Sequence, residues 1–191
     1  MKSLRDKLIL ITGGARGIGY SIARRLGQDG SRLLLADLDT AELERARESL
    51  QQEGLTCSVF TVDVTNTDSL AEFRQSVHDQ IGPIDVLVNN AGVVFGGPFL
   101  ELPLEKHLLT YRVNVDGVVA MTYNFLPDLI AAEEGHLVLE PDLEVKGLEV
   151  VPALFHEAHE RDRGVDSAGS QYRDSHRHSI LKRVASGVVG K

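Results

Sequence analysis

Two short segments combine small residues and polar groups at spacings that suit a nucleotide. The first reads TGGARGIG and contains Thr12, Gly13, Arg16, Gly17, Ile18 and Gly19. Glycines at this spacing permit a tight turn and a close approach of backbone N–H groups to phosphate. The second segment reads NNAG and contains Asn89, Asn90, Ala91 and Gly92. Small residues and amides after a buried strand would let a cofactor lie against the backbone, although in isolation they also fit a simple turn.

One carboxylate bears on which dinucleotide would bind. Asp37 lies 20 residues after Gly17, at the end of an apolar run. A carboxylate there can accept hydrogen bonds from a ribose 2′-hydroxyl and would repel a 2′-phosphate. Arg16 opposes this preference because a guanidinium could bind that phosphate. The pattern therefore favours NAD and makes NADP the less favoured cofactor. The alternative reading of Asp37 is a solvated acid at a strand end.

Hydrophobic periodicity predicts the elements that would position these residues. Short apolar runs predict strands over residues 7–12, 32–36, 56–62, 84–88 and 136–139. Helical spacing predicts helices over residues 17–28, 40–52, 69–81 and 103–132, the second of them capped by Asp39 or Thr40. This alternation predicts an α/β fold, a doubly wound parallel sheet (Rossmann fold) in the strand order 3-2-1-4-5. Both motifs would then follow the first and fourth strands, where the strand order reverses and ligands bind.

These residues resemble the short-chain dehydrogenase/reductase family over roughly residues 5–139. Its Thr-Gly-x-x-x-Gly-x-Gly and Asn-Asn-Ala-Gly signatures match the two segments, and Asp63-Val64 and Asn114 match two further family positions. The resemblance implies NAD(P)-dependent hydride transfer between an alcohol and a carbonyl. It also implies that Asp63 holds the adenine and that Asn114 supports a proton relay. The stretch FLPDLIAAEEGHLVL is similar to members that act on lipophilic alcohols and ketones.

The resemblance breaks down after the fifth expected strand. The family's catalytic serine and Tyr-x-x-x-Lys are missing. After residue 139 the first serine is Ser167, and none of the four tyrosines is followed by a lysine four residues later. We therefore expect a Rossmann core over residues 1–140, incomplete in its C-terminal half, and a divergent, partly disordered segment over 141–191. Three hypotheses follow: an oxidoreductase by family with doubtful catalysis, an inactive nucleotide-binding or interaction protein, or a truncated product without function.

Composition excludes several other classes. The net charge of −8 argues against nucleic acid as the main partner, since phosphate binding needs clustered Lys and Arg. A single cysteine, Cys57, excludes a disulfide framework and favours a cytoplasmic location, and no apolar run reaches the length of a membrane span.

His156 and His159 are three residues apart, whereas the zinc-protease signature needs two histidines that are four residues apart, so no metal is assigned. The expected partners are the dinucleotide and a small alcohol or carbonyl, and a homo-oligomer is compatible with the family.

Overall fold

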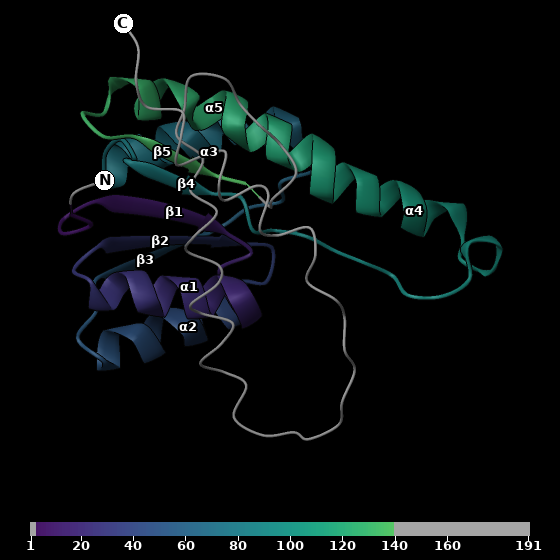
Figure 1. Ribbon diagram of the computed structural model, residues 1–191, viewed down its shortest axis with the longest axis horizontal. Helices are drawn as coiled ribbons and strands as arrows, with labels where there is room; N and C mark the ends of the chain where they lie inside the picture. The colour runs from purple at the N-terminus through teal and green to yellow at the C-terminus, as the bar shows by residue number, and fades with distance from the viewer. Residues whose placement is uncertain (1–2, 140–191) are drawn as a thin grey trace, which may run out of the picture.

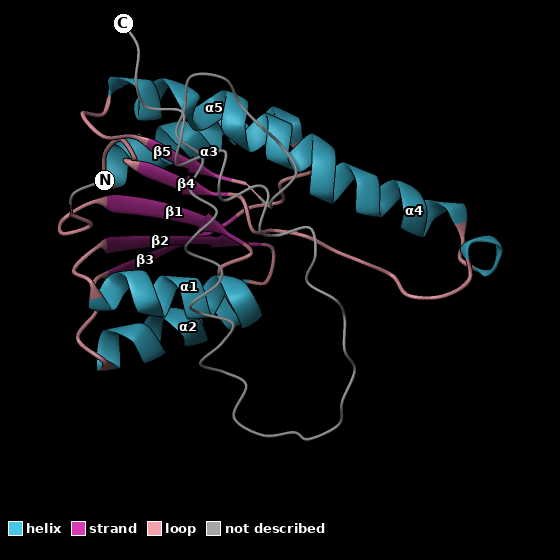
Figure 2. Cartoon of the chain, in the orientation of Figure 1, coloured by secondary structure: helices cyan, strands magenta, loops and turns pink. Residues whose placement is uncertain are grey.

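The computed structural model describes residues 3–139, in which strands and helices alternate (Figures 1 and 2). The strands are β1 (Leu8–Thr12), β2 (Arg32–Asp37), β3 (Cys57–Thr61), β4 (Val86–Val88) and β5 (His136–Val138). The helices are α1 (Gly17–Gln28), α2 (Thr40–Gln52), α3 (Thr67–Gln80), α4 (Leu104–Tyr111) and α5 (Val118–Ala131). A 3₁₀ turn, η1 (Phe99–Glu101), precedes α4, and a π-helical segment, η2 (Arg112–Gly117), separates α4 from α5.

The described strands form one parallel sheet in the order β3-β2-β1-β4-β5. The central strand β1 pairs with β2 on one side and β4 on the other, so that Ile11 lies between Leu35 and Val88. From β1 the chain builds outward to β3 and then returns to place β4 on the opposite side. The strand order therefore reverses between β1 and β4. This confirms the expected doubly wound α/β sheet.

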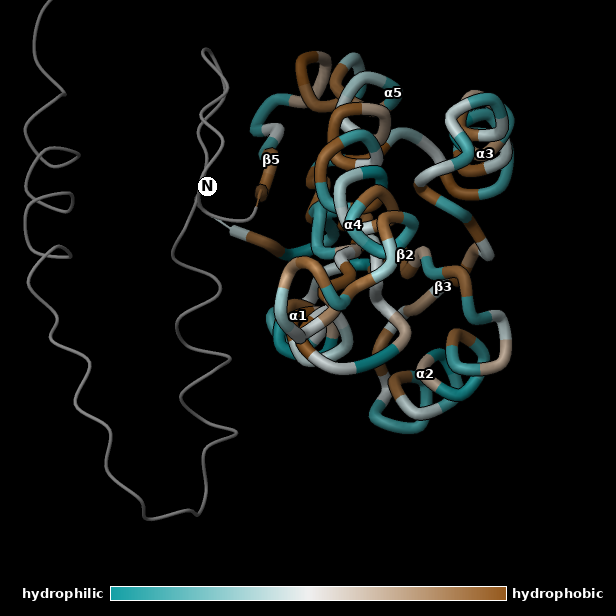
Figure 3. The backbone as a smooth tube through the Cα atoms, turned by 90° about the vertical axis from the view of Figure 1, so that its right-hand side faces the viewer, coloured by the Kyte–Doolittle hydropathy of each residue, from teal (hydrophilic) through white to brown (hydrophobic). Residues whose placement is uncertain are grey.

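Helices cover both faces of the sheet. Figure 1 shows α1 and α2 on one side and α3 and α5 on the other. Because side chains alternate along a strand, Leu8 and Leu10 pack toward α3 and α5, whereas Ile9 and Ile11 pack toward α1 and α2. Figure 3 shows hydrophobic and hydrophilic positions alternating around the turns of the flanking helices, as expected where one face of each helix is buried. The apolar strands are thus enclosed on two sides, as a parallel sheet requires.

Most of the expected elements are confirmed, with boundaries that shift by one or two residues. Helix α2 begins at Thr40 as predicted, because the Asp39 carboxylate accepts a hydrogen bond from the Glu42 backbone N–H at 3.1 Å. Strand β4 is shorter than the predicted range 84–88. The Ile84 amide leaves the strand ladder and donates to the carboxylate of Asp128 instead.

The long helical stretch predicted over residues 103–132 is confirmed, but the sequence did not predict the π-helical segment η2 inside it. Within η2, Asn114 turns toward the loop that follows β4. The Asn114 side chain accepts from the Val93 backbone N–H at 2.9 Å and donates to the Val93 carbonyl at 3.0 Å. Gly117, at the end of η2, lets Val64 approach, since a Cβ there would lie 2.9 Å from Val64 Cγ2. These long-range contacts accompany the widened turn, and π-helical turns of this kind are frequent at functional sites.

A buried carboxylate fixes α5 to α3. Asp128 accepts hydrogen bonds from Arg74 Nη2 at 2.6 Å, from His78 Nε2 at 2.6 Å and from the Ile84 backbone N–H at 3.2 Å. Burial by itself raises the pKa of Asp128, but these hydrogen bonds outweigh it and hold the pKa below its ordinary value. Asp128 is therefore a buried anion whose partners lie on α3 and on the segment that precedes β4.

Several expectations concern residues outside the described range. The C-terminal segment 141–191, with His156 and His159, lies there, and the division of the chain at residue 140 stays a prediction. Within residues 3–139, no helix is long and apolar enough to cross a membrane. The same part of the chain contains no group of three side chains that could ligate a metal ion.

Candidate functional site

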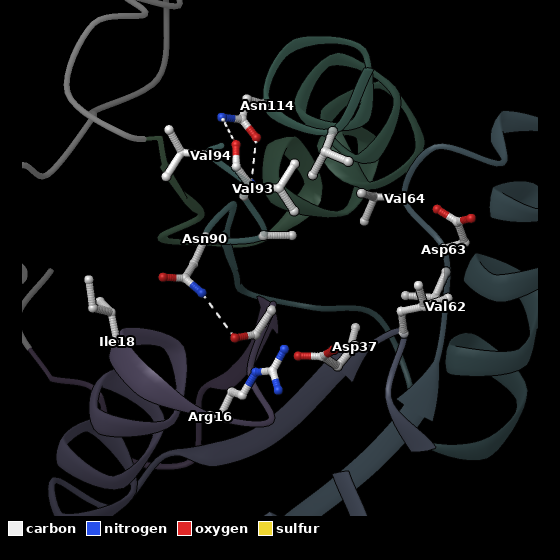
Figure 4. Close-up of a pocket in the computed structure, with 16 residues that line it drawn as sticks. Arg16, Ile18, Asp37, Val62, Asp63, Val64, Asn90, Val93, Val94 and Asn114 are labelled. Atoms are coloured by element: carbon white, nitrogen blue, oxygen red, sulfur yellow. Dashed lines mark hydrogen bonds between the residues drawn. The ribbon is translucent and has the colours of Figure 1, made fainter. Parts of the chain in front are cut away.

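A cleft opens at the carboxyl edge of the sheet, where β1 and β4 end (Figure 4). Its volume is about 540 Å³, in the range of pockets that hold small organic ligands. The lining residues lie at or just after the ends of β1, β2, β3 and β4, in the first turn of α1, or in η2. They are Gly13, Arg16, Ile18, Ala36, Asp37, Leu38, Val62, Asp63, Val64, Asn90, Ala91, Gly92, Val93, Val94, Val113 and Asn114. The position matches the place where open α/β sheets bind ligands, next to the reversal of strand order.

The turn between β1 and α1 depends on its glycines. Gly13 and Gly17 have backbone φ values of +63° and +58°, which residues other than glycine rarely adopt. Gly19 is required for space, because a Cβ there would lie 2.3 Å from the Gly13 carbonyl oxygen. Helix α1 begins directly after Arg16, and no side chain of the described residues caps its N-terminus. The turn therefore presents uncapped helical N–H groups and the positive end of the helix dipole, which suit an anion such as phosphate.

The NNAG segment holds this turn from the β4 side. Asn90 Nδ2 donates to the carbonyl oxygens of Thr12 and Gly13, each at 3.0 Å. In return, Thr12 Oγ1 accepts from the backbone N–H groups of Asn90 and Ala91, each at 3.0 Å. A Cβ on Gly13 would lie 2.9 Å from Ala91 Cα, so the two backbones are in contact. The two sequence motifs therefore form one structural unit.

Asn89 supports the cleft from beneath. Its side chain is buried, and Nδ2 donates to Thr122 Oγ1 on α5 at 3.1 Å. Its backbone N–H donates to the Val138 carbonyl on β5 at 3.0 Å. Asn89 thus ties β4 to β5 and α5, whereas the neighbouring Asn90 faces the glycine turn.

Asp37 ends β2 on the wall of the cleft. Its Oδ2 accepts from the Ala15 backbone N–H at 3.2 Å, and its Oδ1 accepts from the Asp39 backbone N–H at 3.2 Å. A carboxylate has about four acceptor positions, so both oxygens can still accept from a ligand. Arg16 lines the same cleft with a positive guanidinium, and Figure 4 shows both side chains on the side opposite Asn114.

Asp63 and Val64 form the wall that follows β3. Asp63 Oδ1 accepts from the backbone N–H of Thr65 at 2.9 Å and from its hydroxyl at 2.7 Å, which orients the carboxylate. Val62 and Val64 add apolar surface on either side of it. An oriented carboxylate between two valines suits a planar ring that carries a polar edge.

The cleft contains most of the expected site residues. Those that lie behind its lining are Thr12, Gly17, Gly19 and Asn89, which shape the turn and the strand ends. Of the apolar lining, the sequence predictions included Ile18, Val64 and Ala91 but missed Ala36, Leu38, Val62, Val93, Val94 and Val113. Each of these residues lies within two positions of a predicted site residue, so proximity to the motifs could have identified them.

Comparison with known proteins agrees with this geometry. The sequence profile of the family described as short chain dehydrogenase matches residues 7–139. Oxidoreductase UcpA from Escherichia coli (strain K12) is 35% identical over 139 residues, which make up 73% of this chain and 52% of that protein. The chain spans about half the length of the curated relatives it matches.

Two similar solved structures contain a dinucleotide. A metagenomic short-chain oxidoreductase in complex with NADP has a TM-score of 0.67 at 32% identity, covering 82% of this chain and 72% of that one. NAD⁺-bound xylitol dehydrogenase has a TM-score of 0.68 at 28% identity, covering 72% of this chain and 54% of that one. The family profile extends over every strand from β1 to β5 and over every residue of the cleft. The chain therefore belongs to the short-chain dehydrogenase family of NAD(P)-binding oxidoreductases.

Proposed function

We propose that this cleft binds a nicotinamide dinucleotide, NAD in preference to NADP, as the cofactor site of an oxidoreductase for alcohols or carbonyls. One observation carries the proposal. The glycine turn, Asp37, Asp63 and the NNAG segment, although distant in the sequence, line or frame a single cleft. The similar structures that hold NADP and NAD⁺ support a dinucleotide as the ligand class.

The available donors and acceptors suit the successive parts of a dinucleotide. The uncapped N-terminus of α1 would hold the pyrophosphate. Asp37 would accept hydrogen bonds from the adenosine ribose, and Asp63 and Val64 would hold the adenine. The backbone of residues 90–92 would lie against the nicotinamide end. The cleft therefore provides each contact from the chain's own residues.

The preference for NAD rests on charge. The Asp37 carboxylate lies on the cleft wall, fixed by two backbone N–H groups, where a 2′-phosphate would meet a negative charge. Arg16 lines the same cleft and opposes this effect. We assign the larger influence to Asp37, because its carboxylate is held in place and can meet the ribose directly.

Catalysis needs a group that the described cleft does not provide. Bound nicotinamide would supply or accept the hydride, and the substrate oxygen then needs a group that donates a proton in carbonyl reduction and accepts one in alcohol oxidation. Among the described residues, none that lines the cleft is a tyrosine, lysine, serine or histidine. Tyr20 donates to Ser49 Oγ at 2.9 Å, and Tyr111 and Tyr123 are exposed outside the cleft lining. Asn114 would support a proton relay but cannot titrate. This observation favours a second candidate function, nucleotide binding without turnover.

The cellular setting is part of the proposal. Cys57 is buried and is the single cysteine, which fits a reducing compartment such as the cytoplasm. If the protein turns over, we expect a small, lipophilic alcohol or carbonyl as its substrate. The wider partner set then consists of the dinucleotide, this substrate and further copies of the chain.

The binding claim is tested by titration calorimetry of the 191-residue chain with NADH and NADPH. We expect NADH to bind at least about tenfold more tightly, which corresponds to about 1.4 kcal/mol. Asp37→Asn should reduce this ratio, because it removes the charge that repels the 2′-phosphate. Asp79→Asn removes an equal charge from the exposed face of α3 and should keep the ratio. Folded protein that binds neither dinucleotide contradicts the proposal, and a preference for NADPH contradicts the role of Asp37.

A turnover assay distinguishes the two candidate functions. NADH oxidation is followed against lipophilic ketones and aldehydes, with Asn114→Ala as a comparison. Without a proton donor in the cleft, we expect turnover several orders of magnitude below the typical enzyme value of about 10 s⁻¹. Turnover near that value would exclude nucleotide binding as the sole function.

A further inference from the structure

Two consecutive backbone N–H groups of the glycine turn donate hydrogen bonds to residues of β2. The Gly14 backbone N–H donates to the Ala36 carbonyl at 3.3 Å, and the Ala15 backbone N–H donates to Asp37 Oδ2 at 3.2 Å. We propose that Asp37 is a positioning residue for the phosphate-binding turn, which it holds in shape before a dinucleotide arrives. This role rests on the proposed dinucleotide site and is additional to recognition of the ribose.

The turn needs such a restraint because its own backbone selects a conformation only weakly. Gly13 and Gly17 mark its two ends, both at positive φ, and free glycine populates positive and negative φ about equally. Nothing lies within 4 Å of the position that a Cβ on Gly17 would occupy, so there is open space beside that end of the turn. Asn90 restrains the first half of the turn through the carbonyls of Thr12 and Gly13. The hydrogen bonds to β2 restrain the second half.

A carboxylate suits this restraint because it can accept a hydrogen bond at each of its two oxygens. Each oxygen of Asp37 faces one backbone donor, Ala15 on one side and Asp39 on the other. Asparagine has the same shape but one acceptor oxygen, so its NH₂ group would oppose one of these N–H donors. Ala15 is 5% exposed, and its amide has little access to water as a replacement partner. Asparagine can turn its one oxygen toward Ala15 and leave the exposed Asp39 amide to water, so the change that should release the turn is Asp37→Ala, which removes both acceptors.

One side chain then carries two separable properties of the site. The ratio of NADH affinity to NADPH affinity reports how Asp37 acts on the ribose and the 2′-phosphate. A decrease in affinity that is equal for NADH and NADPH reports the released turn. The shape of the empty turn can be measured without any ligand, which keeps this inference separate from the binding claim.

The test is amide hydrogen exchange by NMR on the full chain without cofactor. We expect the Ala15 amide to be protected in the unsubstituted protein and to exchange at least about tenfold faster in Asp37→Ala. The Gly14 amide, bonded to a backbone carbonyl, and the Leu10 amide in the sheet should keep their rates. Asp63→Ala is the matched control, because the Asp63 carboxylate lines the same cleft but bonds only to Thr65 among the described residues. It should leave Ala15 exchange unchanged.

Three results would overturn the inference. The first is an Ala15 rate that is unchanged in Asp37→Ala. The second is faster exchange of Ala15, Gly14 and Leu10 together, which would show general destabilisation in place of local positioning. The third needs no variant: an Ala15 amide that exchanges at the rate of a free peptide in the folded, unsubstituted protein. Failure to bind NADH would refute the proposed function and leave these measurements of the empty turn interpretable.

Discussion

Replacement of Gly19 by alanine tests how closely the glycine turn is packed. The added Cβ would lie 2.3 Å from the Gly13 carbonyl oxygen and 2.5 Å from Asn90 Nδ2, whereas ordinary contact begins at 3.4 Å. These two atoms are hydrogen-bonded to each other at 3.0 Å, so moving either by about 1 Å breaks that bond. Overpacking costs about 1–3 kcal/mol, and the lost hydrogen bond about 1 kcal/mol more. We expect Gly19→Ala to lower the free energy of unfolding by about 3 kcal/mol.

Gly17→Ala is the matched control within the same turn. Its φ of +58° makes alanine unfavourable by about 1–2 kcal/mol, but the added Cβ enters open space. Both variants are compared by urea denaturation followed by circular dichroism, and by titration with NADH. Gly19→Ala should also weaken NADH binding at least about tenfold, because the displaced groups shape the phosphate turn. The reasoning is refuted if Gly19→Ala is no more destabilising than Gly17→Ala, or if it binds NADH normally.

Three further predictions concern other parts of the fold. Asp128→Asn should lower the free energy of unfolding by about 3 kcal/mol at pH 7, because it leaves buried donors without their anion. Since the pKa of Asp128 is lowered by folding, its stabilisation is present above the ordinary value of 3.8 and is lost as the pH falls through the folded value. Urea denaturation at pH 7 and pH 3 checks this, with Asp79→Asn as a nearly neutral control, and an equal loss at both pH values contradicts it. Burial raises the pKa of the Cys57 thiol to about 12, so iodoacetamide should modify it only in urea, as read by mass spectrometry. Asn114→Ala removes both hydrogen bonds to Val93 and should cost about 2 kcal/mol in thermal unfolding.

Local sequence was sufficient to predict the sheet and the glycine turn. The strands are short apolar runs whose burial on both faces needs no knowledge of their partners. Helix α2 carries its own start signal in Asp39, which caps the helix through a contact three residues away. Right-handed crossovers then leave few ways to order the strands, so the switch point and the cleft followed from the order of elements alone.

The two neighbouring asparagines show where local sequence was insufficient. Asn89 and Asn90 have the same side chain, but the first binds Thr122 beneath the sheet edge and the second binds the glycine turn. Nothing in the pair itself distinguishes them, because each role depends on which segment the fold brings close.

The sequence by itself determined the fold class, the strand order and the place of the site, since each depends on hydrophobic periodicity or on glycine positions that local sterics require. Tertiary structure alone decided that the long helix widens into a π-helical segment at Asn114, how α5 is bound through Asp128, and how Asp37 meets the amide of Ala15. Asp37 and Ala15 are 22 residues apart, and Asn114 and Val93 are 21 residues apart. Hydrogen bonds between such distant residues leave no periodic pattern in the sequence, because their geometry exists only after the strands have paired and the helices have packed.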